Sequence, residues 1–445
     1  MKPNILFLSI DSLRSDKIYG KNKSSLTPNI DNLIKNGTYF SQATSTSDTT
    51  GLSIGSLITA IYPFKTGITH FSYNSDVQTF FQIFKDYGYQ TYATVPDAPF
   101  FLNTFKNLTG IDTYVYDKRD SWLQLIGGIG NQIIEQLEKN FTEPWLYYIH
   151  LMDLHAPFFI PKEFNAKKYG DTNYDQMISS IDFWIGKFLE KIDLKKTIVI
   201  ISADHGDHIP IVDNWNDAPK SHSLLKKGKQ IFPLLEPIGL KLFVKYNEII
   251  RKNKINKLKN NLSEKELLAL LGRGQDHLYD ELIRIPLIFT GFGIPSNKII
   301  LEHVKQVDIF PTIADLLDLT VKNDIDGKSL VPLLTDNFFQ ETPAYIETGS
   351  RNPKSAKNPT LYGKIIGIRT SKYKYWRSRN DSLKNVTLFD LEHDPKEENN
   401  IASNNPSIVN SMEEILNNMK KNFIDINKNK IFTEDENVIE EELKK

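Results

Sequence analysis

The stretch Thr197-Ile-Val-Ile-Ile-Ser-Ala-Asp-His205 is an apolar run that ends in a carboxylate and an imidazole. An unbroken run of β-branched residues is typical of a strand buried on both faces, as in a parallel sheet. Ligands of open α/β sheets bind at the carboxyl ends of such strands. The run Asn4-Ile-Leu-Phe-Leu-Ser-Ile10 has the same character and ends at Asp11. A lone aspartate there is equally typical of a helix N-cap, but two strands that end alike favour a metal site.

Composition limits the class of protein more than its function. The 445 residues allow two or three domains. A formal net charge of -1 gives no electrostatic case for nucleic acid, so we expect no nucleic-acid partner. The absence of cysteine excludes disulfides and a cysteine nucleophile. The N-terminal apolar stretch is short, and no apolar run approaches ~20 residues, so we expect no signal peptide or membrane helix and a cytoplasmic location.

Strand-like and helix-like segments alternate along most of the chain, which predicts βαβ units. We expect an α/β domain over 1–334, with a mostly parallel central sheet flanked by helices. A smaller antiparallel α+β subdomain is expected at 335–425, followed by a charged tail at 426–445. The basic insertion 209–273 breaks the alternation and is predicted to cap the site. Residues 220–260 could contact a membrane surface or an anionic substrate, although an ordinary solvated insertion is the simpler interpretation.

A hydroxyl-rich segment, Thr44-Ser-Thr-Ser-Asp-Thr-Thr-Gly-Leu-Ser53, precedes an apolar helical pattern. A hydroxyl at a helix start lies beside free backbone N–H groups and the positive end of the dipole, which can hold an anionic ester. A nearby metal could lower the pKa of that hydroxyl and make it a nucleophile. Taken alone, the composition favours the more common role of helix caps and turn formers.

Several motifs in one consistent order resemble the sulfatase family of the alkaline phosphatase superfamily. They span roughly residues 4–402 and comprise Asn4–Asp11, Leu26–Ala43, His150–Phe158, Asp204–Asp207, Leu278–Ile288, Val307–Leu317, Asp326–Leu330, Ile368–Tyr375 and Leu388–Pro395. The resemblance implies an alkaline-phosphatase-like sandwich and a metal-dependent ester hydrolase. The basic insertion is the main departure from the family pattern.

The resemblance places Thr50 where the family has the cysteine that becomes formylglycine. The motif Leu57-Ile-Thr-Ala-Ile-Tyr-Pro63 is the anchor, and Ser53 and Ile54 then match the family's serine and arginine. Thr50 cannot become formylglycine, and relatives with a threonine nucleophile are similar to phosphodiesterases and phosphotransferases. We therefore predict a hydrolase or transferase of phosphate esters, with Thr50 as nucleophile and Thr49 as the fallback.

The resemblance also implies a metal site made by Asp11, Thr50, Asp204 and His205. Ser12 stands where the family has a second acid. Two carboxylates, an imidazole and a hydroxyl oxygen suit Zn²⁺ or Mn²⁺, whereas the missing acid and the imidazole argue against Ca²⁺. One metal site is expected here.

A second metal site is left open by the sequence. Its candidates are Asp153, His155 and either His277 or His222, although relatives often have their histidine at the position of Gly274. His155 is equally well explained as a catalytic histidine that contacts the substrate or protonates the leaving group without a metal.

Three alternatives to a phosphate-ester enzyme remain. The first is a sulfatase that works without formylglycine, and the second is a catalytically lapsed protein that binds sulfated or phosphorylated glycans. The third is a lipid headgroup transferase whose basic insertion rests on a membrane. The expected substrate is therefore a small-molecule, lipid or glycan ester, and the sequence does not indicate an oligomeric state. His150 is expected to be a packed strand-end histidine, and His208 to position the following loop.

Overall fold

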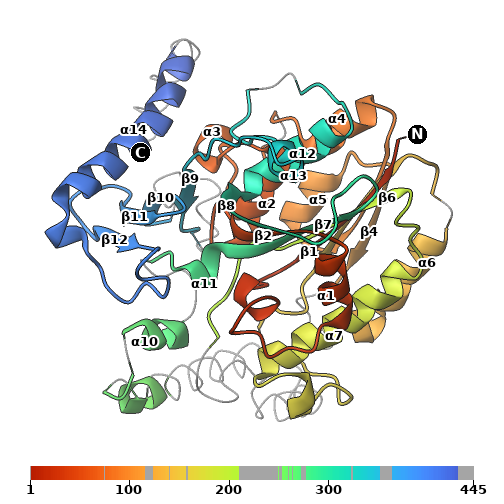
Figure 1. Ribbon diagram of the computed structural model, residues 1–445, viewed down its shortest axis with the longest axis horizontal. Helices are drawn as coiled ribbons and strands as arrows, with labels where there is room; N and C mark the ends of the chain where they lie inside the picture. The colour runs from red at the N-terminus through yellow and green to blue at the C-terminus, as the bar shows by residue number, and fades with distance from the viewer. Residues whose placement is uncertain are drawn as a thin grey trace, which may run out of the picture.

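The computed structural model describes residues 2–74, 76–115, 124–139, 141–156, 159–209, 249, 253–258, 260–262, 264–271, 277–321, 324–350 and 363–428. The described residues form an eight-stranded sheet with helices on both faces, and a four-stranded sheet beside it (Figure 1).

The large sheet has the strand order β4-β3-β5-β1-β6-β7-β2-β8. Its strands are β1 (Asn4–Ile10), β2 (Gly37–Thr44), β3 (Gln90–Pro96), β4 (Gly110–Tyr114), β5 (Trp145–Leu151), β6 (Thr197–Ser202), β7 (Arg284–Gly291) and β8 (Lys298–Lys305). Neighbouring strands are parallel except that β7 runs antiparallel to both β6 and β2. The predicted α/β fold with a mostly parallel central sheet is confirmed.

The register at the centre of the sheet positions the candidate site. β1 lies between β5 and β6, and every residue of these three strands is buried. Ser9 of β1 pairs with His150 of β5 and with Ser202 of β6. Because the three strands are parallel and end together, the residues that follow them meet at one edge of the sheet.

Helices α1 (Pro28–Lys35), α6 (Gly130–Glu138) and α7 (Asn173–Leu189) cover one face of the large sheet (Figure 1). Helices α2 (Thr50–Thr59), α4 (Phe80–Asp86), α5 (Pro99–Phe105) and α12 (Ile309–Leu316) cover the other face. Shorter helices are α3 (Pro63–Thr66), α10 (Glu264–Leu271), α11 (Asp280–Ile283), α13 (Val331–Leu334), a π-turn at Leu125–Ile129, and 3-10 turns at Ser15–Lys17, Lys167–Tyr169, Gln306–Asp308 and Ala402–Asn404. Capping boxes at Thr79 and Thr172 fix the starts of α4 and α7.

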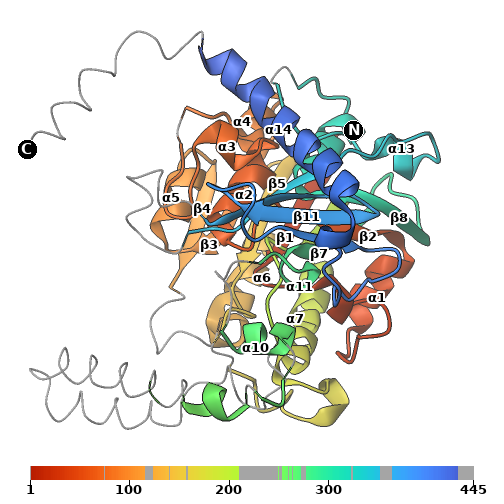
Figure 2. The same cartoon turned by 90° about the vertical axis from the view of Figure 1, so that its left-hand side faces the viewer.

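The small sheet is antiparallel and has the order β12-β11-β10-β9. Its strands are β9 (Ala344–Glu347), β10 (Ile365–Arg369), β11 (Tyr373–Ser378) and β12 (Thr387–Asp390). The helix α14 (Pro406–Lys428) lies across this sheet (Figure 2) and packs Met412 and Leu416 against Ile368 and Tyr375.

The small sheet also contacts the hydroxyl-rich segment that leads into α2. The backbone N–H of Glu347 donates to the carbonyl oxygen of Thr46 at 2.9 Å. The N–H of Gly349 donates to Asp48 Oδ1 at 2.8 Å. A Cβ on Gly349 would lie 2.0 Å from the hydroxyl oxygen of Thr49, so only glycine fits at this contact.

The predicted basic insertion, 209–273, falls largely outside the described residues, as does His222. Within the insertion the structure describes the helix α10. The role of 220–260 in membrane or substrate contact therefore stays a prediction. Among the described helices, none has the length and apolar character needed to cross a bilayer.

Gly291, at the end of β7, has a φ of +95°, and a Cβ there would lie 2.1 Å from the carbonyl oxygen of Thr197. We predict that Gly291→Ala lowers the free energy of unfolding by about 2 kcal/mol or more, because it adds a clash to an unfavourable backbone. Gly293→Ala is the matched control: its φ is +71°, but nothing lies within 4 Å of the added Cβ. Its cost should stay near ~1 kcal/mol. Urea unfolding measures both, and equal losses would contradict the prediction.

Candidate metal centre and nucleophile

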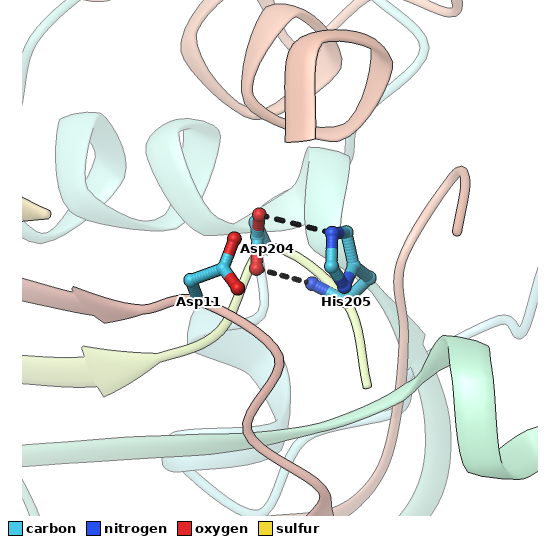
Figure 3. Close-up of side chains that lie close together, drawn as sticks. All are labelled: Asp11, Asp204 and His205. Atoms are coloured by element: carbon cyan, nitrogen blue, oxygen red, sulfur yellow. Dashed lines mark hydrogen bonds and ion pairs between the residues drawn. The ribbon is translucent and has the colours of Figure 1, made fainter. Parts of the chain in front are cut away.

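Asp11, Asp204 and His205 lie together at the carboxyl edge of the central strands, with their side chains close to one another (Figure 3). All three are fully buried, and their ligand atoms lie within 4.8 Å of one another. Two buried carboxylates at this separation repel each other unless a cation offsets their charge. Oxygen and imidazole donors in this arrangement could hold a divalent metal.

Backbone groups hold the two carboxylates in place. The N–H groups of Ser12 and His205 both donate to Asp204 Oδ1, at 3.1 and 2.8 Å. The Ser12 hydroxyl donates to Asp11 Oδ1 at 2.6 Å. Ser12 thus stands at the position of the family's second acid but orients Asp11 instead of adding a third carboxylate. Ser12 has a φ of +62°, a left-handed conformation that is strained for serine and that the turn after β1 requires.

The imidazole of His205 is oriented by its own loop. Its Nδ1 lies 2.8 Å from the carbonyl oxygen of Gly206, so Nδ1 carries the proton and donates. The lone pair of Nε2 then faces the carboxylates, with Asp204 Oδ2 at 3.3 Å. A neutral imidazole held by a backbone carbonyl is the usual arrangement of a metal-binding histidine.

Thr50 presents its hydroxyl to this group from the first position of α2. Its Oγ1 lies 3.2 Å from Asp11 Oδ2 and 3.3 Å from His205 Nε2. The Thr49 hydroxyl instead lies 3.1 Å from the hydroxyl of Ser47. Between the two threonines that the sequence left open, the structure therefore brings Thr50 to the buried carboxylate and imidazole.

The structure adds Gln306, which the sequence interpretation missed. Its Nε2 donates to the carbonyl oxygens of Ala203 and Asp204, at 3.0 and 3.1 Å. The Ser53 hydroxyl lies 2.5 Å from the same carbonyl oxygen of Asp204 and 3.0 Å from Gln306 Oε1, and it can donate to either. These bonds fix the end of β6 from which Asp204 and His205 project. Ile54, at the position of the family's arginine, is fully buried in the hydrophobic core.

His70 is a second residue that the sequence interpretation missed. Its Nδ1 accepts a hydrogen bond of 3.4 Å from the N–H of Gly51, directly after Thr50. The neutral ring therefore carries its proton on Nε2 and can donate there. A Cβ on Gly51 would lie 2.4 Å from the carbonyl oxygen of His70, so the loop after α3 passes against the start of α2.

The candidates for a second metal are not brought together in the same way. Within the described ranges, Asp153, His155 and His277 do not form a group whose ligand atoms all lie within 4.8 Å. Asp153 is buried and accepts a hydrogen bond of 3.2 Å from the N–H of Leu125. His155 is exposed on the loop after β5. The second metal site stays a prediction, and the described geometry adds no support for it.

His277 contacts His208, and their Nε2 atoms lie 2.8 Å apart. His208 Nδ1 lies 3.2 Å from Glu281 Oε2, which is also 3.4 Å from the guanidinium of Arg14. Burial and the neighbouring His208 lower the pKa of His277 to about 3, so its ring is neutral. The pair connects the residues that flank the basic insertion in the sequence.

His150 lies inside β5 and is fully buried. The Tyr148 hydroxyl lies 3.2 Å from its Nδ1, and the ring of Phe101 packs against it at 4.7 Å between centroids. Burial lowers the pKa of His150 to about 4, which keeps it neutral at physiological pH. This environment agrees with the packed strand-end role expected for His150.

A mostly parallel sheet between two helical layers, with acidic, imidazole and hydroxyl groups at its carboxyl edge, together with the family match below, defines a protein of the alkaline phosphatase superfamily. Within that superfamily the chain belongs to the sulfatase family. The Sulfatase family model matches residues 3–319. The model for the C-terminal region of N-sulphoglucosamine sulphohydrolase matches residues 274–429.

Arylsulfatase K of Canis lupus familiaris is 28% identical to this chain over 148 residues. The match covers 31% of this chain and 26% of that relative, so it spans about a quarter of the relative's length. The phosphonate monoester hydrolase of Agrobacterium radiobacter has a TM-score of 0.66 at 16% identity, covering 95% of this chain and 96% of that one. A 2-O GAG sulfatase has a TM-score of 0.65 at 18% identity, covering 96% and 93%. The solved structures share the fold.

We predict that Asp204→Asn lowers the affinity for Zn²⁺ or Mn²⁺ by about a hundredfold or more, because it removes a charged ligand while keeping an oxygen that can accept the two backbone bonds. Metal at a hundred times its Kd should stabilise the unsubstituted protein by about 3 kcal/mol. Metal analysis of the purified protein and thermal unfolding with added metal measure both effects. His393→Ala is the control, because His393, Asp390 and Glu392 form another acidic group at the surface. If His393→Ala lost its metal and Asp204→Asn kept it, the assignment of the metal site to Asp11, Asp204 and His205 would be contradicted.

Burial raises the pKa of Asp153 to about 7, although the N–H of Leu125 stabilises the charged form. Between pH ~4 and the folded pKa, the folded state binds one more proton than the unfolded state, so stability falls as the pH rises through this window. Asp153→Asn keeps an acceptor for Leu125 and removes the titration. We predict that the variant loses less stability between pH 5 and 8, by on the order of 2 kcal/mol. Denaturant unfolding at both pH values measures this, and an unchanged pH dependence would contradict it.

Proposed function

We propose that this protein is a metal-dependent hydrolase of phosphate esters that uses Thr50 as its nucleophile. The observation that carries the proposal is the position of Thr50 Oγ1, within 3.3 Å of both Asp11 and His205. The sequence has no cysteine, so the formylglycine of the sulfatase family cannot form. A threonine hydroxyl is a weak nucleophile at neutral pH, and these neighbours are the groups that could activate it.

In this mechanism, Thr50 Oγ attacks phosphorus in line with the leaving oxygen, so an O–P bond forms as the ester O–P bond breaks. Asp11 Oδ2 accepts the hydrogen bond of the attacking hydroxyl and takes up its proton as the new O–P bond forms. A divalent metal held by Asp11, Asp204 and His205 would supply a lowered hydroxyl pKa and neutralise charge on the ester. The N-terminus of α2 contributes its dipole to the same charge.

Two histidines complete the proposed reaction. His70, with its proton on Nε2, donates to an ester oxygen beside the start of α2. His155, on the exposed loop after β5, gives a proton to the leaving oxygen, and the alcohol departs. Water then attacks the phosphothreonine and gives one proton to His155, while Thr50 Oγ departs with the proton that Asp11 held, so phosphate is released and the Thr50 hydroxyl is restored. An acceptor alcohol in place of water would make the protein a transferase.

Hydrolysis of sulfate esters by the same threonine is the second candidate. The match of residues 3–319 to the sulfatase family and the similarity to an arylsulfatase support it. The fold is also shared with a phosphonate monoester hydrolase, which acts on a phosphorus ester by its name. Ile54 stands in place of the arginine that would support the formylglycine, which argues against the usual sulfatase mechanism in this chain.

We predict that Thr50→Ala lowers kcat for aryl phosphate and phosphodiester substrates by about a thousandfold or more, because it removes the group that forms the covalent intermediate. Thr50→Ser should keep part of the activity. Thr49→Ala should stay within about tenfold of the unsubstituted enzyme, because its hydroxyl lies beside Ser47. Parallel assays with aryl phosphate, phosphodiester and aryl sulfate measure the rates. Faster sulfate turnover would favour the second candidate, and Thr50-independent turnover would exclude this mechanism.

A further inference from the structure

A cluster of aromatic rings and lysines lies at the surface around α7. We call it the α7 patch, and its residues are Leu26, Phe164, Tyr169, Phe183, Lys168 and Lys187. The rings are contiguous: Phe164 lies 4.9 Å from Tyr169 and 5.9 Å from Phe183, between centroids. Phe183 is 45% exposed although it sits on a helix that otherwise buries its apolar residues against the sheet.

Leu26 extends the patch. Its side chain is 50% exposed, and its backbone N–H donates to the hydroxyl of Ser179 at 2.8 Å. Ser179 lies one helical turn before Phe183 on α7, so the two exposed apolar side chains share one surface. The N–H of Leu26 also lies 3.4 Å from the carbonyl oxygen of Tyr169, so Leu26 adjoins the aromatic cluster and enlarges its apolar surface.

Lysines accompany the rings. Lys187 Nζ lies 4.6 Å from the centroid of Phe183, and Lys168 Nζ lies 4.8 Å from that of Tyr169. An ammonium over a ring face is a cation–π contact, and it occupies the face that a sugar ring would stack on. The segment Lys162-Glu-Phe-Asn-Ala-Lys-Lys168 holds three lysines and one glutamate, so its charge is positive. The exposed apolar side chains of the α7 patch therefore lie among positively charged lysines.

We propose that the α7 patch binds the surface of a membrane that contains anionic phospholipid. Aromatic edges and a leucine side chain can enter the region between headgroups and acyl chains, while the flanking ammonium groups reach the lipid phosphates. Each lysine near such a surface is attracted by the negative potential of the anionic lipids. None of the residues of the patch belongs to 220–260, and none takes part in the proposed reaction.

The position of the patch relative to the candidate site fits this surface. The Tyr174 hydroxyl, in the first turn of α7, donates to the carbonyl oxygen of Ser12 at 2.6 Å. The start of α7, which follows Tyr169 closely in the chain, therefore adjoins the edge of the sheet that carries Asp11. In both ribbon views α7 lies on the same lower side of the molecule as α10 of the basic insertion (Figures 1 and 2). Binding there would hold the site close to the membrane surface.

The test is sedimentation of the full chain with vesicles of phosphatidylcholine alone or mixed with phosphatidylglycerol. We expect binding to the mixed vesicles to be roughly tenfold tighter or more, and to weaken as salt is added. Lys168→Glu with Lys187→Glu should reverse the local charge and lower binding by roughly tenfold or more. Leu26→Ser with Phe183→Ser should lower it comparably, because it removes the inserted apolar groups.

Phe338→Ser with Leu383→Ser is the matched control, since these side chains are 88% and 90% exposed elsewhere. It should bind like the unsubstituted chain, and thermal unfolding identifies any variant that fails to fold. Equal binding to both kinds of vesicle, or binding that the charge-reversed and serine variants keep, would overturn the proposal. So would self-association that the Phe183 substitution abolishes, because the patch would then be a protein interface. Turnover of a soluble aryl phosphate should stay unchanged in all variants, which separates this test from that of Thr50.

Discussion

The parallel pairing of β1 with β5 and β6 is the constraint on which the site depends. Ser9 lies in register with both Ser202 and His150, so the three strands end at one level. Asp11 and Asp204, which are almost two hundred positions apart in the chain, then lie next to each other. A slip of one residue in this register would turn every side chain of β1 to the opposite face and separate the two carboxylates.

Two carboxylates are buried side by side at the candidate site, and neighbouring hydrogen-bond donors stabilise their negative charge. Backbone N–H groups of Ser12 and His205 stabilise Asp204, and the hydroxyl of Ser12 stabilises Asp11. Hydrogen bonds such as those from Ser12, His205 and Thr50 offset only part of the cost of burying two carboxylates. The remaining imbalance is the physical reason to place a divalent cation among these groups, with His205 as its neutral ligand.

Local patterns in the sequence predicted the strands and the meeting of Asp11 with Asp204, because buried parallel strands have a continuous apolar signature. These patterns could not predict that β7 is antiparallel to β6, because an apolar run such as Ile285–Phe289 is typical of a buried strand in either direction. The position of Thr50 beside Asp11 and His205 was predicted from the family motif Leu57–Pro63, which sets the place of the nucleophile in the sequence. Gln306 and His70 were missed because each acts through a hydrogen bond to a backbone group that no local pattern marks. His277 was chosen for its place beside a motif, and no pattern in the sequence predicted its contact with His208.

The segment between Thr46 and Thr50 is held from two sides. At its C-terminal end this segment begins α2, which lies over the large sheet. On the other side, the N–H of Glu347 in β9 donates to the backbone of Thr46, and the N–H of Gly349, just after β9, donates to Asp48. Thr50, the proposed nucleophile, thus follows a segment that contacts both sheets, and a side chain at Gly349 would clash with Thr49. Separation of the two sheets would release this segment before either sheet had lost its own hydrogen bonds. The activity should therefore report on the docking of the sheets, and it would disappear in a partly opened form that still keeps its full secondary structure.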